Sequence, residues 1–415
     1  MNSVSSRSLE RGALTGALIF AFCSAACAGE LKTAPSLALS EEYNDNILET
    51  AGNRHSDMVT RVRPGISLGY QGPRATGDLS YTFDYRTYAK GTRSDEQVHT
   101  LNLVGSAALT ENRLFLDLRD TLSRVSLNVT RNVTQESLFL NQTDQNLAAI
   151  SPYLVWHPGE KGVLKTGYRF ADTSYWGGQG IDKRSHQGYA DYLVELAPRF
   201  SLNANYSYSR VHTAAIRYQQ HDASGGFRYE YATNSFLYGT LGNSWQSFEG
   251  LKNTSSLFWN VGVSRTWQHL AASVESQVIY AEDPLAISTR QTSHSARLEL
   301  PFTHGTLALN GSYNKYQGSL NGIADRTSLV FGGSGRWDLT DQLSAMVGLG
   351  WDRVRGEATS AYPYHMTGNA GLSYRFNYEI TANLSYGYVE YRRRFESAAD
   401  LRQTNRVLLE VAKVF

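Results

Sequence analysis

The chain has 415 residues, with 39 lysines and arginines against 38 aspartates and glutamates, so its formal net charge is +1. This balance argues against a nucleic-acid-binding protein, because such proteins carry a basic excess. Beyond residue 30 there is no run of 18 apolar residues, which excludes transmembrane helices. The 26 Tyr, 16 Phe, 7 Trp and 36 Gly favour strands joined by turns.

The N-terminal segment has the features of a secretory signal peptide. Arg7 and Arg11 precede the apolar stretch 12–22, and Ala26-Cys27-Ala28 fits a cleavage site. We therefore expect a signal peptide over 1–28 and one mature domain over 29–415. Lipidation at Cys27 is the alternative, although the usual Leu three residues earlier is missing. Because both cysteines lie in this segment, the mature chain has no disulfide or Cys-ligated metal.

Apolar and polar residues alternate over most of the remaining chain. Within 78–90, Leu79, Tyr81 and Phe83 alternate with polar residues, and the segments 201–209 and 380–388 repeat this period of two. Such a period predicts strands with one apolar and one polar face. The expected strands run about 10 to 15 residues, which is the length needed to cross a bilayer at a tilt.

Short and long connections alternate between the expected strands. Turns such as 72–74, 111–113 and 340–341 alternate with longer loops such as 44–57 and 128–143. This alternation is typical of outer-membrane barrels, whose short turns face the periplasm. The sequence therefore predicts an all-β, closed antiparallel transmembrane β-barrel in the cell outer membrane, with about 20 strands (18–22). Its first strand lies near 34–43 and its last over 404–415. A soluble sandwich, propeller or β-helix is the alternative, disfavoured by the strand lengths.

Aromatic residues gather at the ends of the expected strands, as an interfacial girdle requires. Tyr70, Tyr88 and Trp337 are examples. The chain ends in Phe415, on an apolar face broken only by Lys413. We expect Phe415 to be the signal that the barrel-insertion machinery reads.

Strand phase assigns a set of charged residues to the inner face. Positive and negative members balance, which predicts weak ion selectivity. Opposite charges two residues apart are predicted to neutralise each other along the wall, and a polar ladder that guides a hydrated solute is the alternative interpretation. Fourteen members are the candidate lumen-lining residues: Arg61, Arg63, Asp84, Arg86, Asp117, Arg119, Lys165, Arg169, Arg228, Glu230, Arg297, Glu299, Arg336 and Asp338. The other eight members are Lys90, Arg375, Asp78, Asp191, Glu195, Asp222, Glu275 and Asp352, which brings the set to eleven residues of each sign.

Amide and phenol side chains fill the inner face between these charges, including Tyr189, Asn203 and Asn205. Such groups suit carbohydrate, because amides hydrogen-bond hydroxyls and rings stack on sugar faces. The loop 128–143 is the candidate constriction of the lumen, and the alternative is a surface loop.

No catalytic or cofactor motif occurs in the chain. The metalloprotease pattern H-E-x-x-H, the nucleophile elbow G-x-S-x-G and the phosphate-loop spacing are all missing. The sequence therefore predicts a protein that is not an enzyme and that has no catalytic residues, no metal and no cofactor.

Two segments resemble a known family. The run Glu41 to Ile47 (EEYNDNI) and the strand Arg61 to Tyr70 (RVRPGISLGY) are similar to outer-membrane β-barrel porins often associated with exopolysaccharide export systems. The resemblance implies an outer-membrane porin with polysaccharide secretion as its context, and it supplies no catalytic residues. Residues 42–46 either bind a cation or partner or cap the first hairpin.

Two functional hypotheses follow. The first is a pore that passes hydrophilic material, by export of exopolysaccharide or by diffusion of polar solutes. The second is a structural sheath that docks a periplasmic partner protein or cytochrome; the chain lacks Cys-x-x-Cys-His, so any haem belongs to the partner. The expected partners are outer-membrane lipid, the barrel-insertion machinery, polysaccharide and a periplasmic export protein.

Overall fold

The computed structural model describes residues 29–127, 142–177, 179–318, 324–356, 363–393 and 401–415. These residues form strands and their connections, and among them no helix is long and apolar enough to cross a membrane. The expected signal peptide lies outside this described part. The twenty strands are β1 (Glu30–Asn44), β2 (Asp57–Gln71), β3 (Ala75–Tyr88), β4 (Glu96–Thr110), β5 (Leu114–Ser126), β6 (Gln142–Trp156), β7 (Gly162–Trp176), β8 (Lys183–Ala197), β9 (Phe200–Thr213), β10 (Arg217–Ala232), β11 (Ser235–Phe248), β12 (Thr254–Thr266), β13 (Ala271–Ala281), β14 (Thr289–Phe302), β15 (Gly305–Gly318), β16 (Ala324–Asp338), β17 (Leu343–Gly356), β18 (Tyr364–Arg375), β19 (Ile380–Arg392) and β20 (Arg402–Val414).

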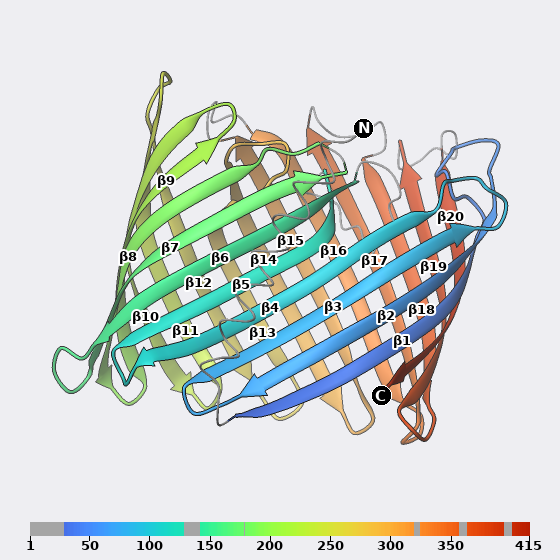
Figure 1. The fold of residues 1–415 in the computed structure, drawn as a ribbon, viewed down its shortest axis with the longest axis horizontal. Coiled ribbons are helices and arrows are strands. Elements are labelled where there is room, and N and C mark those ends of the chain that lie inside the picture. Colours follow the sequence, from blue (N-terminus) through green and yellow to red (C-terminus); the bar gives the residue numbers. More distant parts are fainter. Residues whose placement is uncertain (1–28, 128–141, 178, 319–323, 357–362, 394–400) are drawn as a thin grey trace.

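Each strand pairs antiparallel with its neighbours in the chain, and the ring closes between the first strand and the last. The β1–β20 register runs from Ser36 opposite Val414 to Asn44 opposite Arg406. Figure 1 shows the inclined strands, with β1 in blue meeting β20 in red. Closure gives each of the twenty described strands a neighbour on both sides, as a barrel in lipid requires. The predicted closed antiparallel barrel of 20 strands is confirmed.

The two rims of the barrel differ in their connections. One rim carries turns of two to five residues, for example 72–74 and 303–304, and the other carries connections as long as 45–56. We call these the short-turn rim and the long-loop rim. In outer-membrane barrels they face the periplasm and the outside of the cell, respectively. The loop 128–143, expected to constrict the lumen, lies almost entirely outside the described residues.

The two faces of the wall differ as the period of two predicts. One face exposes large apolar side chains, such as Leu241, Leu257 and Leu349. The other carries Lys183 of β8 and Arg326 of β16, and both of these contact the single connection 282–288. Because one loop reaches two such distant strands only through the inside of the ring, this polar face is the inner one.

A small apolar cluster lies at the long-loop rim beside the first hairpin. Ile47 from the loop after β1 packs against Val59 and Tyr88, all of them buried. The expectation that Tyr88 belongs to the outer aromatic girdle is therefore wrong, since only 5% of its surface is exposed and it shares the inner face. The reason is that the loop folds inward over it, with the Ile47 amide donating to the carbonyl of His55 at 2.8 Å.

The last residue is tied to the first strand. The Phe415 amide donates to the carbonyl of Pro35 at 2.8 Å, and its ring remains exposed. Lys413 places its Nζ 4.6 Å from the centre of that ring. This cation–π contact gives the charge a partner on an otherwise apolar face.

The difference between the two faces predicts that an added charge lowers the stability of the barrel on the outer face but not on the inner face. Leu349, near the middle of β17, is 70% exposed on the outer face. We expect Leu349→Arg to lower the free energy of unfolding by about 2–4 kcal/mol, because the guanidinium would face hydrocarbon. Denaturant unfolding of the barrel in lipid vesicles measures this.

The matched control is Asn369→Arg in β18, on the inner face next to Gly348. A lumen-facing arginine stays in water, so we expect a change within about 0.5 kcal/mol. Equal losses from the two variants would contradict the assignment of faces.

Candidate functional site

The cross-strand registers place all fourteen predicted charged residues on the inner face. Arg61 lies opposite Arg86 and Lys165 lies opposite Asp191. Neighbours two residues apart on a strand share these faces. The set is spread around the ring, so the structure brings its members together in local groups rather than at one point.

Three of the five expected pairs along a strand form. Arg86 contacts Asp84 at 2.7 Å, Arg297 contacts Glu299 at 3.0 Å, and Arg336 contacts Asp338 at 3.4 Å.

The other two expected pairs have different partners. Asp117 accepts a hydrogen bond from Ser106 at 2.8 Å, which leaves Arg119 beside it on the inner face. Arg228 lies 4.1 Å from the centre of the Phe236 ring, and Glu230 accepts from the amide of Asn234 at 3.2 Å. Strand phase therefore locates a charge but does not select its partner.

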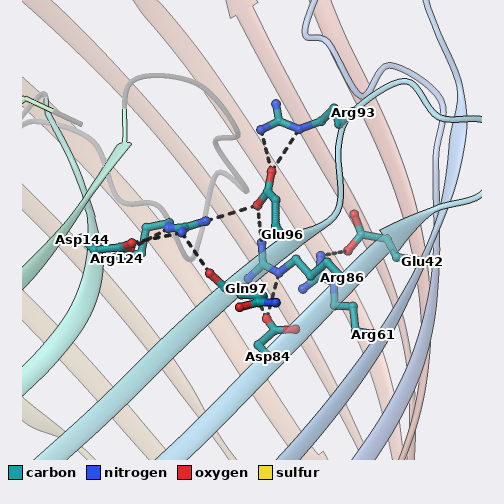
Figure 2. Close-up of polar contacts among 9 residues, drawn as sticks. All are labelled: Glu42, Arg61, Asp84, Arg86, Arg93, Glu96, Gln97, Arg124 and Asp144. Atoms are coloured by element: carbon teal, nitrogen blue, oxygen red, sulfur yellow. Dashed lines mark hydrogen bonds and ion pairs between the residues drawn. The ribbon is translucent and has the colours of Figure 1, made fainter. Parts of the chain in front are cut away.

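An ionic network links β3, β4, β5 and β6 near the long-loop rim. Figure 2 shows Glu96 at its centre, with Arg93 at 2.7 Å, Arg124 at 3.2 Å and Arg86 at 4.0 Å. Arg124 also binds Asp144 of β6 at 2.8 Å. One carboxylate thus serves three guanidiniums from two strands and a loop, which fixes the relative positions of their ends.

The seam between β1, β2 and β20 carries a second ionic group. Arg61 Nη2 contacts Glu42 Oε2 at 2.7 Å, and the Glu42 side chain is only 3% exposed. Arg63 pairs with Glu410 of β20. Both pairs join residues from different strands of the seam, so they favour this register over a shifted one.

Residues of the motif 42–46 form hydrogen bonds across the same seam. Asp45 accepts from the backbone amide and the side-chain amide of Asn405, both at 2.7 Å. Asn46 Nδ2 donates to the carbonyls of Thr50 and Gln403, at 2.8 and 2.9 Å. These bonds fit the interpretation of a polar cap on the first hairpin, and the cap extends to β20.

The connection 282–288 enters the lumen and joins its opposite walls. Asp283 is fully buried and binds Arg326 of β16 at 2.7 Å. Glu282 binds Lys183 of β8 at 2.5 Å, and the amide of Ile181 donates to the carbonyl of Pro284 at 2.9 Å. The loop therefore forms a bridge inside the barrel.

Apolar contacts support this bridge. Ile287 packs against a cluster of Val211, Tyr218 and Phe248 on β9, β10 and β11. The sequence predicted a constriction at the loop 128–143 and not at this one. The available signal was two adjacent acidic residues in a short loop, together with unpaired inward cations on distant strands. Such a pattern does not show which cation an acid reaches.

Within the described residues, no group of three or more His, Cys, Asp or Glu is placed to hold a metal ion. The inner wall offers charged, hydrogen-bonding and aromatic side chains.

No protein-family model matches the chain, and no curated protein matches it in sequence. Solved structures with a similar fold include the FrpB iron transporter from Neisseria meningitidis, F5-1 variant, at 10% identity and a TM-score of 0.54. That match covers 92% of this chain and 83% of the other. A mutant ferric enterobactin receptor from Pseudomonas aeruginosa matches at 8% identity and a TM-score of 0.52, covering 92% and 80%.

At such identities the likeness concerns the fold, which is that of outer-membrane barrels. Together with the apolar outer face and closed ring, it places this protein in the outer membrane. These two solved structures are named as an iron transporter and a ferric enterobactin receptor, and neither is named as an exopolysaccharide porin.

The ion pair of the bridge can be tested by removing one partner. We expect Arg326→Met to release the loop 282–288, because breaking a buried ion pair costs about 3–5 kcal/mol. The loop should become accessible to protease while the barrel keeps its heat-modifiable migration on a gel. Mass spectrometry of the digest locates the cleavage.

Arg336→Met on the same strand is the control, since its ion pair with Asp338 is exposed. It should leave the digestion pattern unchanged. A protected loop in Arg326→Met would show that the ion pair does not hold the bridge.

The seam network gives a stability prediction. Glu42→Ala leaves the partly buried Arg61 without its carboxylate, so we expect the free energy of unfolding to fall by about 3 kcal/mol. Glu30→Ala removes an exposed partner of Lys32 and should cost at most about 1 kcal/mol. Denaturant unfolding compares the two, and similar small losses would refute a structural role for the Glu42 pair.

Proposed function

We propose that this protein is a water-filled channel that passes hydrophilic material across the outer membrane. The observation that carries the proposal is the accessibility of its inner charges. The side chains of Arg297 and Arg336 are 62% and 65% exposed although they face the inside of the ring. Described protein atoms therefore do not fill the space in front of them.

The size of the ring supports the same proposal. Strands spaced about 4.8 Å apart and tilted give a 20-strand barrel a backbone diameter of roughly 40 Å. Side chains cannot fill a lumen of that width. The bridge 282–288 narrows it near the long-loop rim, and the ionic groups line the wall beside it.

Within this function we favour export of exopolysaccharide over general diffusion of polar solutes. The support is the resemblance of residues 41–47 and 61–70 to barrels associated with such export, together with the amide-rich inner face. A sheath around a periplasmic partner protein is the alternative, and it predicts little current from the isolated barrel.

The proposal includes the route to the membrane. Residues 1–28 would direct secretion, and the final strand with Phe415 would be read by the barrel-insertion machinery. Outer-membrane lipid then contacts the apolar face.

Single-channel conductance of the refolded protein in a planar bilayer tests the channel. We expect a large and steady current, with a cation-to-anion permeability ratio within about threefold of one, because the inner charges balance. The double variant Arg297→Gln/Arg336→Gln should shift the ratio towards cations, since it removes two positive charges from the inner wall.

Lys413→Gln is the control for that shift, because this lysine lies on the outer face beside Phe415 and should not affect the ratio. Absence of current from a heat-modifiable, folded barrel would contradict the channel and favour the sheath.

A further inference from the structure

A recess on the inner wall combines aromatic and planar polar side chains at mid-height of the barrel. It lies on β7 to β10, and its lining includes Arg169, Tyr189, Asp191, Asn205 and Asp222. These residues come from four adjacent strands in register, with Asp191 opposite Asn205. The recess is thus built by the rigid wall rather than by a loop.

The aromatic part of the recess continues towards the short-turn rim. The Tyr189 hydroxyl lies 3.2 Å from the Ser151 hydroxyl, two residues from Tyr153 on β6. Tyr153 stacks on Phe115 of β5, with ring centres 5.3 Å apart and planes 16° from parallel. Ring faces thus follow one another from the rim to the recess.

Each of these tyrosines also lies beside a cation. Lys165 Nζ is 5.7 Å from the centre of the Tyr153 ring, and the Arg169 guanidinium is 5.5 Å from the centre of the Tyr189 ring. Such contacts hold long side chains against the rings and orient their remaining donors into the lumen.

The acceptors of the recess are held by neighbouring amides. Asn205 Nδ2 donates to Asp191 Oδ1 at 2.9 Å. Gln220 Nε2 donates to both oxygens of Asp222, at 3.0 and 2.9 Å. A carboxylate accepts about four hydrogen bonds, so each retains capacity for further donors, such as ligand hydroxyls.

We propose that Phe115, Tyr153, Tyr189, Asp191, Asn205 and Asp222 form a binding track for an uncharged saccharide chain. Ring faces suit the apolar C–H faces of sugars, and fixed carboxylates and amides suit their hydroxyls. Two cations and two carboxylates balance along the track, which favours a neutral chain over a polyanion. The inference rests on the proposed channel and names its substrate class.

The bridge lies above this track on the same strands. Tyr175, six residues beyond Arg169 on β7, donates to Glu282 at 2.8 Å, and Lys183 of β8 binds the same carboxylate. The track therefore leads from the short-turn rim to the underside of the loop 282–288. A chain entering from that rim would meet the track before the constriction.

The track can be tested in a planar bilayer by adding maltohexaose and recording how often and for how long the sugar interrupts the single-channel current. We expect maltohexaose to interrupt the wild-type current, and polyethylene glycol of matched mass to do so far less. Tyr189→Ala should shorten the mean interruption about tenfold, because the stacking face is lost. Tyr189→Phe keeps the ring and should stay within about twofold of wild type.

Asn310→Ala, an inner-face change on β15 far from the recess, is the matched control and should leave the interruptions unchanged. Heat-modifiable migration verifies that every variant is folded. Equal interruption by the polymer and the sugar, or no change in Tyr189→Ala, overturns the track while the channel stands.

A barrel without current refutes the channel but still permits a test of the track. Titration calorimetry of the folded barrel in detergent then measures maltohexaose binding directly. Binding by the wild type that is lost in Tyr189→Ala supports the track. Equal heats of binding for the two proteins, or no heat of binding for the wild type, overturn it.

Discussion

Closure of the ring is the constraint on which the rest of this structure depends. In lipid every backbone donor and acceptor needs a partner, so the first and last strands must meet in one register. Here that register is reinforced by side chains, since Glu42 binds Arg61, Arg63 binds Glu410 and Asp45 binds Asn405. The segment with the most recognisable sequence thus lies at the seam, and its described contacts join strands 1, 2 and 20.

A ring of twenty strands creates a second problem, which is an interior too wide for side chains to fill. The chain meets it in two ways. Most inner charges stay in contact with water and pair locally, so the wall carries balanced charge. Near the long-loop rim, the connection 282–288 crosses the space and is held by a buried ion pair with Arg326 and a more exposed one with Lys183. The same wall can therefore be open at mid-height and narrowed at one end.

The solved structures of similar fold have the same barrel architecture, although only about one residue in ten is identical to this chain. The proposed saccharide track uses rigid strands to present rings and carboxylates at fixed spacing, which limits the entropy lost on binding. Its position beneath the bridge links substrate binding and constriction in one sector of the barrel.

The period of two determined the fold class and the face on which each of the fourteen charged residues lies, whereas the strand number followed only approximately, as 18–22, from the count of strands and connections. Fold class and face are local properties, because alternation follows from the steric geometry of a strand whatever its neighbours are. Partner choice was not local. Arg63 and Glu410 are 347 positions apart in the chain, and Tyr88 became buried because a loop folded over it. The direction of the loop 282–288 was likewise decided by cations on distant strands, since a short connection has no periodicity of its own. Only the tertiary structure, which fixes register and brings opposite walls within reach, decides such contacts.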